Sequence, residues 1–187
     1  MTEPSISISR DIDAPAARIF AVVSDPAMHP ELDGTGMLRS AVDNEVITQV
    51  GDVFHISMVH WHLGNYVMAN HVIVFEQDRR IGWEPIVHSY ENPDYVQAVG
   101  RPGLREWGWK LEPLGESRTR VTEYFEGSRL PQELRTFIED GEFWRPAMEV
   151  SMDNLEQLVT DSNTTGGEPP RSKTASEFVE LFQSTRT

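Results

Sequence analysis

The chain has 187 residues, of which 39% are hydrophobic and 25% charged, values that suit a globular domain large enough to bury a core. Its net charge of −14 repels phosphate backbones and anionic lipid headgroups, so we expect no nucleic-acid binding. The absence of cysteine excludes disulfide bonds and thiolate metal sites.

The N-terminal segment predicts one strand and two short helices. Residues 5–12 alternate between polar and apolar side chains, as in a half-buried strand. Pro15 suits the first turn of a helix, and apolar residues follow it at helical spacing. Pro26 ends this helix and begins a second short one that reaches about Leu32.

The central part of the chain predicts strands joined by short turns. The predicted strands are 37–49, 52–62, 65–77, 80–89, 103–112 and 118–128. This close spacing favours an antiparallel meander over strand–helix–strand units. Residues 90–102 are expected to form a loop.

A long amphipathic helix is predicted after Pro131. Apolar side chains recur at steps of three and four residues as far as Val159, and Pro146 predicts a kink or a break between them. The composition of 162–187 predicts a flexible tail with a short amphipathic segment. We therefore predict one ligand-binding domain at 1–161, followed by this tail.

The order of these elements predicts an α+β fold. A curved antiparallel sheet of about seven strands has an apolar concave face that must be covered. The long C-terminal helix is the one predicted element large enough to cover it. The two short helices would then connect the first strand to the far edge of the sheet.

Four stretches resemble the SRPBCC (START-like) superfamily, and most closely its polyketide cyclase/dehydrase and lipid-transport group. They read DIDAPAARIFAVVSDP, VGDVF, RRIGWEP and SRTRVTEYF, and the resemblance covers roughly residues 4–160. It implies a helix-grip fold with a hydrophobic cavity between the sheet and the long helix. It also implies ligands such as lipids, polyketides and hormones, and in some members cofactor-free aldol cyclisation or dehydration. The fold alone does not select among these functions.

The first long hairpin sets a predicted register. A two-residue turn at 63–64 would pair Ile56 with His71 and Phe54 with Ile73. The more apolar face, which we assign to the cavity, then holds Phe54, Ile56, Met58, His60, His62, Val67, Ala69, His71, Ile73 and Phe75. The alternative register turns the histidines outward, and the lining is then Trp61, Tyr66 and Met68.

The last hairpin supplies further inward positions. A five-residue loop at 113–117 would pair Trp109 with Val121 and Trp107 with Glu123, with Arg105 diagonally across from Glu123. The ligand-binding candidates are therefore Phe54, Ile56, Met58, Ile73, Trp83, Arg105, Trp107, Trp109, Trp144 and Met148.

The candidate catalytic residues are Glu123, His71 and His60. An inward carboxylate is costly unless it is paired, so Glu123 is either a structural ion paired with Arg105 or an acid–base group with a raised pKa. A histidine would move the second proton of a cyclisation. In the predicted register His71 lies about 13 Å along the strand from His60, so no metal site is predicted.

Two classes of function remain open. One is an enzyme that cyclises or dehydrates a polyketide-type substrate without a cofactor, and the other is a non-catalytic carrier or sensor of a hydrophobic molecule. A homodimer and a protein partner of the tail are also left open. No apolar run approaches the roughly 20 residues that span a bilayer, so we expect no membrane insertion and a cytoplasmic location.

Overall fold

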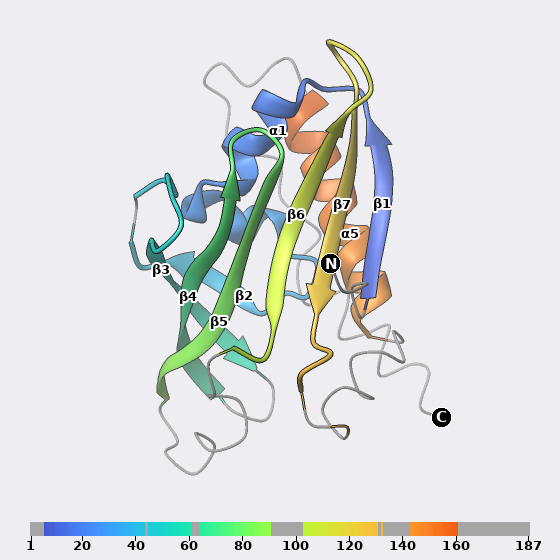
Figure 1. Ribbon diagram of the computed structural model, residues 1–187. Coiled ribbons are helices and arrows are strands. Elements are labelled where there is room, and N and C mark those ends of the chain that lie inside the picture. Colours follow the sequence, from blue (N-terminus) through green and yellow to red (C-terminus); the bar gives the residue numbers. More distant parts are fainter. Residues whose placement is uncertain are drawn as a thin grey trace, which may run out of the picture.

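The computed structural model describes residues 6–43, 45–60, 64–90, 103–130, 132 and 143–160. They form a seven-stranded antiparallel sheet with helices on its concave side, which confirms the predicted α+β class (Figure 1). The elements are β1 (Ile6–Ile12), α1 (Ala16–Val23), the 3-10 helix η1 (Pro26–Met28), α2 (His29–Leu32), β2 (Leu38–Ala41), β3 (Val53–His60), β4 (Gly64–Glu76), β5 (Arg80–Tyr90), β6 (Glu106–Pro113), β7 (Thr119–Glu126) and α5 (Trp144–Thr160).

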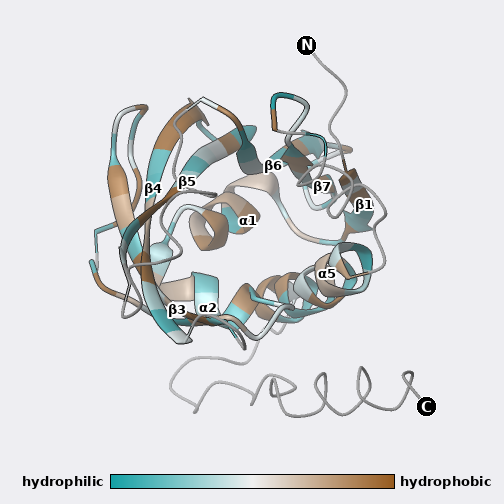
Figure 2. Ribbon diagram, turned by 90° about the horizontal axis from the view of Figure 1, so that it is seen from below, coloured by the Kyte–Doolittle hydropathy of each residue, from teal (hydrophilic) through white to brown (hydrophobic). Residues whose placement is uncertain are grey.

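The strand order places the first two strands at opposite edges of the sheet. The order is β1-β7-β6-β5-β4-β3-β2, and every neighbouring pair is antiparallel. The chain crosses from one edge to the other through α1, η1 and α2, the role predicted for the short helices. Figure 2 shows the strands curving around α1, with α2 and α5 on the side that the strands leave open.

Proline and aspartate define the bounds of the short helices. Pro15 is the extended residue that precedes α1. Asp25 accepts a hydrogen bond from the backbone N–H of Ala27 (3.0 Å) and so caps η1, which begins at Pro26. These residues turn the chain sharply twice before it enters the sheet again.

Strand β2 is much shorter than the predicted strand 37–49. It ends at Ala41, and its register with β3 shifts once. The backbone N–H of His55 then donates to the side chain of Asp43 (3.1 Å). A hydrogen bond to a side chain therefore replaces a strand-to-strand backbone hydrogen bond just beyond β2. A short, irregular strand forms this edge of the sheet.

The predicted register of the β3–β4 hairpin is wrong. Ile56 pairs with Met68 and not with His71, which is a shift of three positions. Gly64 adopts a left-handed backbone conformation (φ 71°) and begins β4 opposite His60, the last residue of β3. Because side chains alternate along a strand, an odd shift reverses the face that β4 turns to the cavity while β3 keeps its predicted face.

The predicted register of the β6–β7 hairpin is displaced by two positions. Trp109 pairs with Glu123, Trp107 pairs with Phe125, and the loop is 114–118. An even shift leaves every side chain on its predicted face. The inward faces of β6 and β7 are therefore those expected from the sequence.

Helix α5 closes the concave side and shares the main core with α1. It begins at Trp144, so Pro146 lies in its first turn, where proline is tolerated. The main hydrophobic cluster contains Ile12, Ile19, Phe20, Val23, Leu111, Val121, Met152, Leu155 and Val159 among others. This packing fills the end of the sheet that α1 covers. The predicted start of the helix near Pro131 lies outside the described residues.

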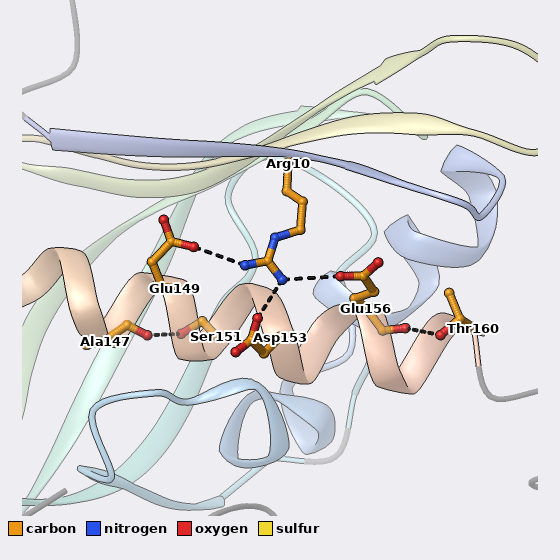
Figure 3. A network of polar contacts seen from close by, with 7 residues as sticks. All are labelled: Arg10, Ala147, Glu149, Ser151, Asp153, Glu156 and Thr160. Carbon is orange, nitrogen blue, oxygen red and sulfur yellow. Dashed lines mark hydrogen bonds and ion pairs between the residues drawn. The ribbon is translucent and has the colours of Figure 1, made fainter.

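An arginine on the edge strand fastens α5 to the sheet. The guanidinium of Arg10 on β1 contacts the carboxylates of Glu149 (3.0 Å), Asp153 (2.6 Å) and Glu156 (3.2 Å) on α5 (Figure 3). The three acidic residues are 42–65% exposed, so each pair is screened by water. The cluster aligns the helix with β1 more than it adds to stability.

Within the described ranges, no helix is both long and apolar enough to cross a bilayer. The predicted tail, 162–187, lies outside those ranges.

Candidate functional site

An internal cavity of about 400 Å³ lies between the concave face of the sheet and the helices α2 and α5. Strands β3 to β7 form its wall, and the segment from α2 into β2 closes one side. Residues of α1 do not contribute, because they are packed into the main core. The cavity therefore occupies the part of the concave face that the core leaves open.

Aromatic rings line two parts of this wall. The rings of His29 and Trp83 are stacked with centroids 5.1 Å apart, and Phe54 packs edge-on against both. In the other part, Trp107 lies 5.3 Å from Trp144 on α5. The cavity is thus bordered by flat apolar surfaces that suit a flat apolar molecule.

Most residues proposed from the sequence as ligand-binding lie in this lining. They are Phe54, Ile56, Met58, Trp83, Arg105, Trp107, Trp109, Trp144 and Met148. Ile73 does not, because the reversed face of β4 turns it outward and leaves it 39% exposed. Tyr66, Met68 and Asn70 take the inward positions of β4 instead.

The two histidines proposed as catalytic lie on opposite faces of the sheet. His60 lines the cavity. His71 pairs with Val53 and Glu84 on the outer face and does not line the cavity. Over the described ranges, no three His, Asp or Glu side chains are grouped closely enough to hold a metal ion.

Glu123 enters the cavity from β7 and is only 9% exposed. Its Oε2 atom has no hydrogen-bond partner. Burial raises the pKa of Glu123 well above its usual value, and the nearby charge of Asp33 raises it further. Both effects favour the protonated form of this carboxyl group.

The predicted ion pair between Arg105 and Glu123 does not form. Glu123 lies opposite Trp109, so Arg105 is four positions away along β6, about 13 Å. The Arg105 Nε–H instead donates to the carbonyl of Pro85 (3.0 Å). The ion pair is absent because the β6–β7 register is displaced by two positions from the predicted one.

Asp33 is a second acid of the lining, partly buried, and the sequence analysis did not identify it. It follows α2 and accepts hydrogen bonds from the backbone N–H (2.8 Å) and the hydroxyl (2.6 Å) of Thr35 and from the backbone N–H of Leu38 (2.8 Å). Burial raises the pKa of Asp33, although these hydrogen bonds oppose the shift.

His29 is a second titratable group of the lining that the sequence analysis missed. It is 4% exposed, and its Nε2–H donates to the carbonyl of Val23 (3.0 Å), so Nδ1 carries the free lone pair of the neutral ring. Burial lowers the pKa of His29 to about 4, which keeps the ring neutral at pH 7. A signal was present: His29 and Asp33 lie one helical turn apart in the segment predicted to close the cavity.

The fold and the site define an α+β protein in which a curved antiparallel sheet and a C-terminal helix border an apolar cavity that is lined by two carboxyl groups. No family model matches the chain. The chain is similar to the "Uncharacterized protein Rv0088" of Mycobacterium tuberculosis, with 31% identity over 122 residues, which are 65% of this chain and 46% of the relative. The chain therefore spans about half the length of the curated relatives it matches.

Solved structures share the fold at low sequence identity. A protein from Arthrobacter aurescens is 18% identical, with a TM-score of 0.61 over 84% of this chain and 90% of its own. Protein Ms6760 from Mycobacterium smegmatis is 14% identical, with a TM-score of 0.55 over 83% of this chain and 90% of its own. At these identities the likeness establishes the fold alone.

Proposed function

We propose that this protein belongs to the SRPBCC (START-like) superfamily, within its polyketide cyclase/dehydrase and lipid-transport group. In this proposal it binds a small hydrophobic molecule, polyketide-like or lipid-like, in the internal cavity. The observation that carries the proposal is a cavity of about 400 Å³ bordered by tryptophan and methionine side chains. Small-molecule sites have volumes of roughly 300–1,000 Å³ and mostly apolar linings.

Two measurements test binding. Native mass spectrometry of protein purified gently from its own host would identify a co-purifying molecule. Titration of that molecule, or of 2-ethylnaphthalene as an apolar probe, should give saturable binding by calorimetry. Trp107→Ala should weaken the affinity about tenfold, because one wall of the cavity loses its ring. Ile73→Ala on the outer face is the matched control and should leave the affinity unchanged.

Absence of saturable binding for both the co-purifying molecule and the probe would contradict the proposal. Equal losses of affinity in Trp107→Ala and Ile73→Ala would also contradict it, because a general effect on folding would then explain the result.

An enzyme is the second candidate, and it is favoured by the buried acid Glu123 and the neutral ring of His29, which line the same cavity. In an aldol cyclisation a base removes the proton next to one carbonyl group, and the resulting carbon attacks a second carbonyl. Glu123 would protonate the new alkoxide, and the base would be His29 or His60. This reaction scheme uses no cofactor.

The two candidates differ in their response to Glu123→Gln. The enzyme should lose turnover of a poly-β-keto substrate while it still binds the substrate, because the amide cannot transfer the proton. A carrier or sensor should bind the same compound and form no cyclic product with either chain. His71→Ala serves as a control, since His71 lies on the outer face.

A further inference from the structure

Two carboxyl groups line the same cavity but differ in their hydrogen bonds. Both oxygens of Asp33 accept hydrogen bonds, from Thr35 on one side and from Leu38 on the other. Glu123 has no hydrogen-bond partner among the described residues. Donors stabilise the ionised form of an acid, and burial disfavours it. Of the two carboxyl groups, Asp33 is therefore the more readily ionised and Glu123 the more readily protonated.

The lining, as far as the structure describes it, offers no cation to Glu123. Arg105 bonds the Pro85 carbonyl and lies about 13 Å away along β6. His29 is held neutral, and His60 lies on β3, near the opposite edge of the sheet. A buried acid with neither a cation nor donors is an O–H group that needs an acceptor.

A second donor in the same wall also lacks an acceptor. The Nε1 atom of Trp144 is buried without a partner. Its ring packs against Trp107, whose partner on β7 is Phe125, the next inward residue after Glu123. This part of the wall thus presents hydrogen-bond donors and leaves the acceptors to the bound molecule.

We propose that the neutral carboxyl group of Glu123 donates a hydrogen bond to a carbonyl oxygen of the bound molecule, so that the cavity selects flat apolar ketones. This inference rests on the proposed function, because it names a polar group of the ligand in that cavity. A carbonyl oxygen provides the missing acceptor without adding a charge. A hydrocarbon of the same shape leaves the O–H group unpaired, and a protonated amine carries only N–H donors and so offers this group no acceptor.

Three probes of one shape test the inference. They are 2-acetylnaphthalene, 2-ethylnaphthalene and 2-(aminomethyl)naphthalene, and their affinities are measured by calorimetry at neutral pH. The unchanged protein should bind the ketone about tenfold more tightly than the hydrocarbon, the usual effect of one buried hydrogen bond. The amine should bind more weakly than the ketone.

Two variants of the same residue separate the hydrogen bond from the shape of the site. Glu123→Gln should keep the tenfold preference for the ketone, because its amide N–H donates in place of the acid. Glu123→Leu should bind the ketone and the hydrocarbon equally. Binding of the hydrocarbon by both variants also verifies that each is folded.

Three results would overturn the inference: equal affinity of the unchanged protein for ketone and hydrocarbon, an unaltered preference in Glu123→Leu, or tightest binding of the amine. In each case the apolar probe still binds and the proposed function stands. If none of the three probes binds, the inference fails; if the co-purifying molecule does not bind either, the proposed function fails as well.

Discussion

The buried ring of His29 should make the stability of the protein depend on pH. Its pKa is about 4 in the folded protein and 6.5 in the unfolded chain, because burial disfavours the charged ring. Between these values the unfolded chain binds more protons. The contribution of His29 is therefore complete above pH 6.5 and is lost as the pH falls toward 4.

The magnitude follows from the two pKa values. A full shift of this size corresponds to about 3 kcal/mol of unfolding free energy, of which about 2 kcal/mol should be lost between pH 7 and pH 5. The measurement is urea denaturation at a series of pH values, followed by circular dichroism. The comparison is with His29→Phe, whose ring can stack on Trp83 without a titratable group.

The difference between the two proteins isolates His29. The raised pKa values of Asp33 and Glu123 act in the opposite direction, since they add stability as the pH falls, but both proteins contain them. His29→Phe should lose stability at every pH through the unpaired Val23 carbonyl, and that loss should not vary with pH. Parallel pH profiles of the two proteins from pH 7 to pH 5 would refute the reasoning.

Two further substitutions probe how α5 is held. Gly34→Ala should lower the unfolding free energy by about 1–3 kcal/mol, because a Cβ atom there would lie 1.9 Å from the Ala147 carbonyl oxygen; an unchanged urea midpoint would contradict this. Arg10→Met should cost about 1 kcal/mol at low salt and less at high salt, since it keeps the apolar stem and removes screened ion pairs. A cost of Arg10→Met that does not change with salt would show that packing, and not charge, holds the helix.

The faces of β6 and β7 could be predicted from the sequence because strand alternation survives an even register error. Trp107 and Glu123 reached the cavity although the predicted hairpin was displaced by two positions. For the same reason the predicted inward face of β4 was wrong, since the β3–β4 register was displaced by an odd number of positions. One glycine, Gly64, begins the strand in a left-handed conformation where a two-residue turn was expected, and the odd shift turned His71 and Ile73 outward.

The polar part of the site was harder to predict because it depends on the segment between α2 and β2. Nothing in the strand pattern indicates that Asp33 lines the cavity, since its position depends on hydrogen bonds from Thr35 and Leu38 after a helix of four residues. His29 likewise depends on the Val23 carbonyl at the end of α1. Such local contacts are set by turn geometry, which the alternation of apolar residues does not report.

The short, irregular strand β2 has a consequence for self-association. The free edge of a sheet is a template on which another chain can add a strand, and long regular edges carry the greatest risk of aggregation. Strand β2 offers four residues interrupted by a register shift. Its backbone therefore gives a second copy little to pair with, and growth of a continuous intermolecular sheet is disfavoured at this border.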